Sequence, residues 1–300
     1  MSSTCCLFQY LIAFAVIWWI MLKYLFVRSS GKNCVESGAV ESDSVGVFVI
    51  NLDRAKARWN FVKQRIDKLS FNVYRVSAVD GQLLNNNEIQ KVSDTERYRR
   101  YFKMYPENGT IGCSLSHEKA WRAFLCSNHE FALICEDDIV FDSNTLKKCI
   151  SHAIEKKDLW DVLILEPYHG GSPVKIQDLY DDHFLCVYFT NVTHAGCYLI
   201  NREAAKKFLQ KFYPIVVPVD HYINAGWEFN IKFLGIEPRA VRQDFGASQI
   251  KVSKPVKFYD WYTVLNNAVY NITRSMVHLL YNCCLYVKLK IALLNKQMHI

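Results

Sequence analysis

Residues 131–141 have the sequence Phe131-Ala132-Leu133-Ile134-Cys135-Glu136-Asp137-Asp138-Ile139-Val140-Phe141, in which three acids separate two apolar runs. The first run has the length and composition of a strand that is covered on both faces. The acids follow at its carboxyl end, where open α/β sheets bind ligands, and they would be costly to bury without partners. Because Mg²⁺ and Mn²⁺ take carboxylate oxygens and substrate phosphates as ligands, the stretch indicates a divalent-metal site. A solvated acidic turn is the alternative interpretation.

The segment upstream of this strand predicts a β-α-β unit. Residues 47–50 form a second candidate for a buried strand, and a helical pattern follows them. Residues 73–76 form the next strand candidate, which the turn residues Asp80-Gly81 close. Strands that alternate with helices favour a parallel sheet with right-handed crossovers, so we expect an α/β fold with a mostly parallel central sheet.

The rest of the globular part predicts further alternating elements. Residues 84–108 are polar and charged, so we expect a mobile loop or an insert there. Ser116 is expected to cap the helix that precedes the acidic strand, and Asn201 to cap a later helix. Apolar runs predict further strands at residues 161–165, 184–189 and 197–200.

Composition limits the class of protein. The chain has 300 residues, of which 51% are hydrophobic, so it can bury the core of one large domain or two small ones. Its formal charge of +7 suits an anionic substrate or an anionic membrane surface. The basic residues are spread along the chain, which does not indicate a nucleic-acid partner. The 11 cysteines form no CxxC pair and no zinc-type spacing, which favours reduced core residues over a disulfide framework.

Residues 1–27 predict a transmembrane anchor. Residues 5–22 are apolar except for Gln9, and a run of this length is enough to span a bilayer. The segment lacks the basic start and the cleavage site that are typical of a signal peptide. A polar linker follows at residues 28–44. The cations Lys23, Arg28 and Lys32 come after the apolar run, so the positive-inside rule places the globular part in the cytoplasm. A Golgi or ER lumenal enzyme is the alternative, with possible glycosylation acceptors at Asn108, Asn191 and Asn271.

The tail, residues 256–300, has apolar residues at helical spacing and several lysines near its end. This pattern predicts a helical tail. It suits a helix that lies on a membrane surface or one that packs on the domain, and we favour packing on the domain.

Several segments together resemble a known family. They are Phe48-Val49-Ile50-Asn51-Leu52-Asp53-Arg54 with Arg58, Ser77-Ala78-Val79-Asp80-Gly81, Ile111-Gly112-Cys113-Ser114-Leu115-Ser116-His117, Leu133-Ile134-Cys135-Glu136-Asp137-Asp138-Ile139, Thr193-His194-Ala195-Gly196-Cys197-Tyr198-Leu199-Ile200 and Pro218-Val219-Asp220. In this order they resemble glycosyltransferase family 25, which contains bacterial lipooligosaccharide galactosyl- and glucosyltransferases and collagen galactosyltransferases. The resemblance covers roughly residues 45–250.

The resemblance implies a GT-A-like single nucleotide-sugar-binding domain, which we place at residues 45–255. It also implies a UDP-galactose or UDP-glucose donor, inversion at the anomeric carbon, and a saccharide, glycolipid or glycoprotein acceptor. By position, Asp138 with Asp137 or Glu136 would bind Mn²⁺ or Mg²⁺. The implied nucleotide contacts are Asn51, Asp53, Arg54 and Arg58 after the first strand, Asp80 after the second, and His117. Arg54 and Arg58 could instead be solvated, and His117 could instead be a satisfied buried residue.

Inversion needs a base that deprotonates the acceptor hydroxyl as it attacks. Asp220 is our first candidate because it lies in the matching Pro-Val-Asp segment, and Glu228 and Asp244 are rivals. Asp220 could instead pair with a core arginine or cap the following helix.

Two other classes of function fit the same residues. A metal-dependent phosphohydrolase would use the same acids, but it would need more metal ligands than one cluster supplies. A catalytically silent, membrane-tethered sugar-binding protein is the third class, although the retained Glu136, Asp137 and Asp138 count against it.

Overall fold

The computed structural model describes residues 44–244 and 261–298. The predicted anchor at residues 1–27 and the linker up to residue 43 lie outside the described residues, as do residues 245–260. Whether residues 45–255 form the whole catalytic unit stays a prediction.

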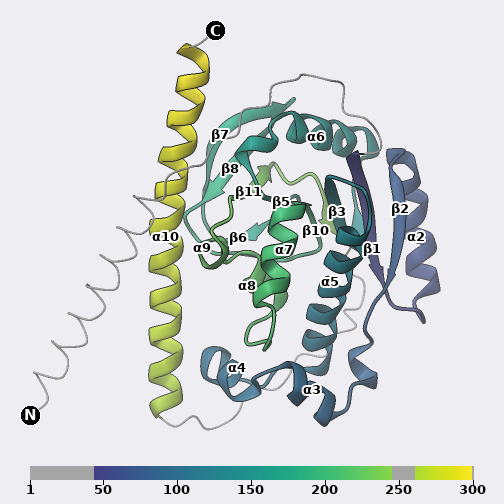
Figure 1. Cartoon of the computed structure of the whole chain (residues 1–300), viewed down its shortest axis with the longest axis vertical. Helices are drawn as coiled ribbons and strands as arrows, with labels where there is room; N and C mark the ends of the chain where they lie inside the picture. Colours follow the sequence, from purple (N-terminus) through teal and green to yellow (C-terminus); the bar gives the residue numbers. More distant parts are fainter. Residues whose placement is uncertain (1–43, 245–260, 299–300) are drawn as a thin grey trace, which may run out of the picture.

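One central sheet organises the domain (Figure 1). Its eight strands have the order β2-β1-β3-β10-β5-β11-β8-β7. Strands β10 and β8 run opposite to the other members, so the sheet is mostly parallel, and the predicted α/β fold with a mostly parallel central sheet is confirmed. The bounds are β1 (Val45–Asn51), β2 (Asn72–Ser77), β3 (Phe131–Glu136), β5 (Val162–Ile164), β7 (Pro173–Tyr180), β8 (His183–Tyr188), β10 (Cys197–Asn201) and β11 (Phe233–Glu237).

Two small two-stranded sheets lie beside it. In one, β4 (Ile139–Val140) pairs with β12 (Arg242–Gln243), and in the other β6 (Tyr168–His169) pairs with β9 (Val192–Thr193). The pairing of β12 with β4 matters for the site, because it brings residues 242–243 next to the acidic stretch, residues 136–138.

Helices cover the sheet, and α5 and α7, which pack on one another, stand in front of it in Figure 1. The helices are α2 (Lys56–Ile66), α3 (Asn86–Val92), α4 (Thr95–Phe102), α5 (Asn108–Cys126), α6 (Ser143–Glu155), α7 (Arg202–Lys211), α8 (Val219–Ile223), α9 (Gly226–Phe229) and α10 (Trp261–Met298). Short 3₁₀ turns are η2 (Asp67–Leu69), η3 (Gly81–Leu83) and η4 (Lys157–Leu159).

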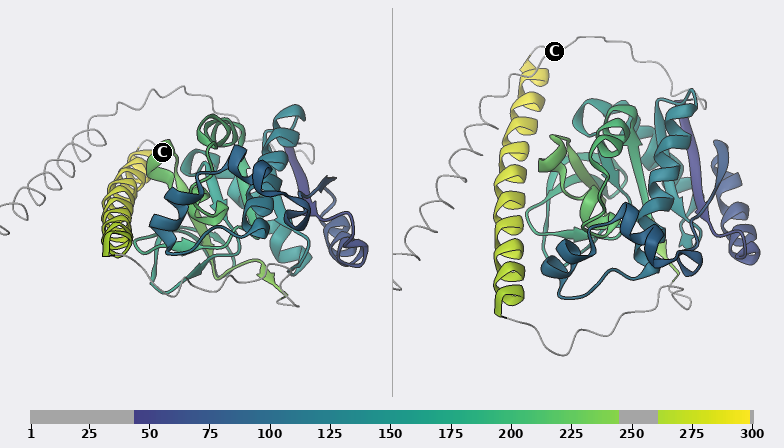
Figure 2. Two further views of the ribbon diagram at one scale, coloured as in Figure 1. Left: turned by 90° about the horizontal axis from the view of Figure 1, so that it is seen from below. Right: turned by 60° about the horizontal axis from the view of Figure 1, so that its bottom comes forward.

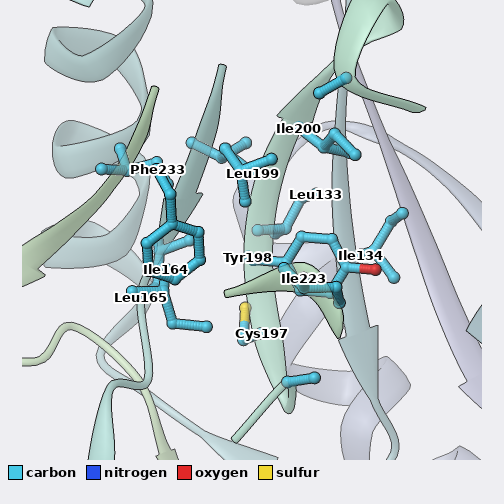
Figure 3. Close-up of a cluster of buried hydrophobic side chains, with 14 of the residues drawn as sticks. Leu133, Ile134, Ile164, Leu165, Cys197, Tyr198, Leu199, Ile200, Ile223 and Phe233 are labelled. Carbon is cyan, nitrogen blue, oxygen red and sulfur yellow. The ribbon is translucent and has the colours of Figure 1, made fainter. Parts of the chain in front are cut away.

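A cluster of buried hydrophobic side chains lies where β3, β10 and β5 pair, and Figure 3 shows Leu133, Leu199 and Ile164 among them. Every residue of 131–135 is buried, because β3 is paired on both edges and covered on both faces. The strand prediction is therefore confirmed. The described cysteines are free, and Cys135, Cys149, Cys186 and Cys197 are buried core residues, as the composition predicted.

Two local predictions are wrong, and each has a physical reason. Residues 84–108 carry helices α3 and α4, because Asn85 and Asp94 cap their amino ends through side-chain hydrogen bonds. Ser116 is not a cap. Its hydroxyl lies inside α5, where it donates to the Gly112 carbonyl at 2.6 Å and accepts from the Val79 N–H at 2.8 Å.

The predicted cap at Asn201 is confirmed. Its side-chain oxygen accepts a hydrogen bond from the Ala204 N–H at 2.8 Å, at the first turn of α7.

Helix α5 meets the turn after β2 at two glycines. A Cβ on Gly112 would lie 2.8 Å from both the Gly81 nitrogen and the Val79 carbonyl oxygen, which are backbone atoms that cannot rotate away. We therefore expect Gly112→Ala to lower the free energy of unfolding by about 1–3 kcal/mol. Thermal melting of the purified chain measures this. Gly170→Ala is the matched control, since a Cβ there would meet open space among the described residues, and an equal loss in both variants would contradict the close packing of α5.

Helix α10 lies along one side of the domain, as Figures 1 and 2 show. It contacts α4, α9, β7 and β8, so the tail is helical and packs on the domain. Among the described residues it is the helix that is long and apolar enough to cross a membrane by length and composition.

Candidate active site

The acids after β3 lie at the sheet edge where β1, β2 and β3 end together. Asp137 is 6% exposed, and the Asn51 side-chain amide donates to its carboxylate at 2.6 Å. The Arg58 guanidinium lies 2.5 Å from Asp137 Oδ1 and 2.7 Å from Asp138 Oδ2. The parallel register sets Ile50 beside Glu136, which brings the end of β1 to the acids. The structure thus joins Asn51 and Arg58 to the acidic turn.

The acidic turn is short of positive charge. Burial raises the pKa of Asp138 to about 7, and the charge of Glu136 adds to this, while Arg58 opposes it. Burial also raises the pKa of Asp137. Burial alone would raise the pKa of Glu136, but the neighbouring His117, Arg58 and Cys113 outweigh it and leave this pKa lowered. Asp138 is therefore the acid whose charge is least compensated.

Two carboxylates converge on the Gln243 side chain. Its amide nitrogen lies 3.1 Å from Glu136 Oε2 and 3.4 Å from Asp138 Oδ1. Strand β12 delivers Gln243 to this place through its pairing with β4. Oxygen donors that converge in a site of uncompensated negative charge fit a hard divalent cation.

A second group could hold a softer metal. Ligand atoms of Cys113, His117 and Glu136 lie within 4.8 Å of one another. However, a cysteine binds metal as the thiolate, and burial with the nearby acids raises the pKa of Cys113 well above its usual value. The carboxylate pair of Glu136 and Asp138 is therefore the better donor set for a metal.

The predicted base faces the same space as these acids. Glu136, Gln243, His194 and Asp220 line one pocket of about 240 Å³, together with Thr110, Cys113, Ala195, Pro218 and Val219. The Asp220 carboxylate accepts hydrogen bonds from the backbone N–H groups of His221 at 2.8 Å and His194 at 3.3 Å. Asp220 lies in the first turn of α8, after its N-cap residue Pro218, so it is not the cap.

Neither of the two rival bases lines this pocket. Glu228 lines a different pocket of about 270 Å³, with Arg97, Lys211 and Arg274. Asp244 directly follows Gln243, and its N–H donates to the Asp138 carbonyl at 2.8 Å. Asp220 is thus the candidate that shares a pocket with Glu136.

The remaining residues implied for the nucleotide pair with one another. The Arg54 guanidinium lies 2.6 Å from the Asp80 carboxylate. Asp53 accepts hydrogen bonds from Ser77 at 2.7 Å and Arg75 at 2.8 Å, and these hold the pKa of Asp53 below its usual value. These pairs stand at the carboxyl ends of β1 and β2, on the exposed side of the sheet edge.

His117 is fully buried behind Glu136. Its Nδ1 lies 3.0 Å from the Tyr198 hydroxyl and its Nε2 lies 3.6 Å from Glu136 Oε1. His117 is thus buried, as the alternative interpretation expected, but among the described residues only its Nδ1 has a hydrogen-bond partner, and its Nε2 faces Glu136 without one.

Three residues of the pocket region, Glu166, His194 and Gln243, had no role assigned from the sequence. Glu166 is 1% exposed, and its carboxylate lies 3.0 Å from His194 Nδ1, which raises the pKa of His194. Glu166 follows a predicted strand directly, which is the same signal that marked Glu136. Gln243 carries no such signal, because only the pairing of β12 with β4 places it.

Comparison with known proteins shows which family the chain resembles. The model of "Glycosyltransferase family 25 (LPS biosynthesis protein)" matches residues 45–223. A "Glycosyltransferase 25 family member" of Aedes aegypti is 31% identical over 61% of this chain and 32% of its own length. Mouse "Procollagen galactosyltransferase 2" is 30% identical over 44% of this chain and 21% of its own. The human "Inactive glycosyltransferase 25 family member 3" is 29% identical over 40% of this chain and 21% of its own.

The chain therefore spans about a third or less of the length of these relatives. Among solved structures, S. aureus TarS 1-349 is similar at 16% identity, with a TM-score of 0.40 over 67% of this chain and 60% of its own.

Proposed function

This chain belongs to glycosyltransferase family 25, and we propose that it is an inverting hexosyltransferase that moves galactose or glucose from a UDP-sugar to a saccharide or glycoconjugate acceptor. One observation carries the proposal: Asp220 and Glu136 line a single pocket beside the undercompensated Asp138. A transferase of this kind needs a base for the acceptor and a cation site for the diphosphate, and a pocket lined by two carboxylates supports this proposal.

Each proposed role follows from a contact of the chain. Glu136 and Asp138 would hold Mn²⁺ or Mg²⁺, which when bound supplies charge neutralisation to a diphosphate leaving group. Arg58 and Asn51 fix Asp137 and the acidic turn, and His117 orients Glu136. Asp220 takes the proton of the acceptor hydroxyl. Arg54, Asp53 and Asp80 bind the nucleotide at the adjacent sheet edge, where Arg54 can exchange its pairing with Asp80 for a phosphate.

Measuring the reaction products distinguishes this proposal from a phosphohydrolase. The full chain is incubated with UDP-galactose or UDP-glucose, a divalent metal and an acceptor. A transferase forms UDP and glycosylated acceptor in equal amounts, whereas a phosphohydrolase cleaves the diphosphate of the same donor into UMP and hexose 1-phosphate. UMP and hexose 1-phosphate without any glycosylated product would overturn the proposed reaction.

The acceptor has two candidate classes. The family description names lipopolysaccharide biosynthesis, which agrees with the lipooligosaccharide-type acceptor that we propose first. Relatives named procollagen galactosyltransferases favour a collagen-type hydroxylysine acceptor as the second candidate. A silent sugar-binding protein is a third possibility, since one relative is named inactive.

We propose that the chain is a single-pass membrane protein with its catalytic domain in the cytoplasm, and we expect protease added outside sealed cells to leave this domain intact. The cluster of cations after the apolar run of residues 5–22 supports this orientation. The free cysteines of the described residues also fit a reducing compartment. The measurement is an immunoblot after protease treatment, with detergent-opened cells as the control. Digestion in sealed cells would place the domain outside the cell, and a glycan at Asn108 or Asn191 would favour the Golgi or ER lumen.

A further inference from the structure

Helix α10 presents an apolar stripe on the side that faces away from the domain. The stripe runs from Trp261 to Met298 and includes Ile272, Leu279 and Ile291, all of them exposed. Its members recur every three or four positions, so at about 100° per residue they fall within an arc of about 120°. The buried residues of α10, such as Val277 and Leu285, lie on the opposite arc. In Figures 1 and 2 no other described element lies outside this outer side.

The inner face of α10 carries polar groups that donate hydrogen bonds to the domain. Arg274 donates to the His221 carbonyl at 2.6 Å, and His278 Nε2 donates to the Tyr188 carbonyl at 2.9 Å. The Tyr281 hydroxyl donates to the Ile231 carbonyl at 2.7 Å. If α10 crossed a bilayer, these groups would enter hydrocarbon and lose their partners, which is costly for a charged or polar side chain. The helix therefore stays on the domain although its length and composition would permit a span.

We propose that the outer stripe of α10 lies on a lipid surface, so that the helix is sandwiched between the domain and the bilayer in which the chain is anchored. An amphipathic helix of this kind immerses its apolar face by about 5–10 Å while its other face stays outside the hydrocarbon. At about 1.5 Å per residue, the 38 residues of α10 form a contact line about 57 Å long.

Three features favour lipid over another occupant. The predicted anchor at residues 1–27 would hold the domain near a bilayer, since residues 28–43 reach about 55 Å when fully extended. Such a tether raises the local concentration of the bilayer around the domain, so a weak contact is enough to keep α10 on the lipid surface. Residues 261–298 contain no Asp or Glu, so an anionic lipid surface would not be repelled. The exposed Trp261 and Tyr262 at one end are residues that favour membrane interfaces.

Photocrosslinking of the full chain in phosphatidylcholine–phosphatidylserine nanodiscs tests this contact. A benzophenone amino acid replaces Ile272, Leu279 or Ile291, which are 61%, 43% and 52% exposed, so the substitutions should not disturb the core. Leu83, 82% exposed on η3, is the matched control. We expect phospholipid adducts at the three stripe positions and none above background at Leu83. Met276→Glu with Val287→Glu should abolish the adduct at Leu279 without changing the melting temperature.

The other outcomes identify other occupants and would overturn the proposal. Crosslinks that join two copies of the chain would make the stripe a dimer interface. Crosslinks only to residues 5–27 would make it a docking site for the chain's own anchor. An absence of adducts at all three stripe positions would show that the stripe faces water.

Discussion

Asp138→Asn is expected to lower sugar transfer by at least about 10³-fold, because the metal site loses a charged oxygen ligand. A bound metal supplies several kcal/mol of charge stabilisation, and about 1.4 kcal/mol corresponds to a factor of ten in rate. Asp138 is the acid least compensated by its neighbours, with its pKa raised to about 7 chiefly by burial. Steady-state assays with saturating donor over a range of Mn²⁺ and Mg²⁺ concentrations measure the loss.

The same substitution should not unfold the chain. The folded-state pKa of Asp138 lies above its ordinary value of 3.8, so ionising it opposes folding increasingly as the pH rises from about 4 through 7. A neutral Asn removes this penalty, and the melting temperature without metal at pH 8 should stay equal or rise. Asp142→Asn is the matched control, since Asp142 only caps α6 and Asn caps a helix equally well. Full activity of Asp138→Asn with either metal would eliminate the metal assignment.

Asp220→Asn is expected to lower kcat by about 10²–10⁴-fold while the affinity for the UDP-sugar stays unchanged. The reason is position: Asp220 lines the pocket with Glu136, and its contacts within the chain come from backbone N–H groups. An amide keeps the size of the side chain but cannot accept a proton. Donor binding by calorimetry and turnover at saturating acceptor separate the two effects.

Control substitutions at the rival bases sharpen this result. Glu228→Gln changes a residue of another pocket, so the turnover of this variant should stay normal. If Asp220→Asn lowers thermal stability and donor affinity but leaves turnover at saturation nearly normal, Asp220 has a structural role. Asp244, next to the acidic turn, would then be the base to examine.

Local patterns in the sequence predicted strands β1, β2, β3, β5, β8 and β10 and the acidic turn, but not β7 or β11. Residues 131–135 form an apolar run that is typical of a buried strand, and acids at its end are expected at a sheet edge. The parallel order of β2, β1 and β3 brings Asn51 beside Asp137.

Contacts between distant segments could not be predicted in this way. Gln243 reaches Glu136 across 107 positions because β12 pairs with β4, and no local pattern encodes that pairing. Arg58 was predicted as a nucleotide contact or a solvated residue, and no local pattern showed that its side chain lies between Asp137 and Asp138. The helices at residues 84–108 were missed because single capping side chains, Asn85 and Asp94, outweigh the polar composition.

The most direct test of the account is transfer of radiolabel from UDP-galactose and UDP-glucose to lipid-linked and collagen-type acceptors by the full chain. The account predicts that label from one donor reaches one acceptor class when Mn²⁺ or Mg²⁺ is present, and that neither Asp138→Asn nor Asp220→Asn transfers it. Binding of a UDP-sugar without label in any acceptor would contradict the account and favour the silent sugar-binding protein.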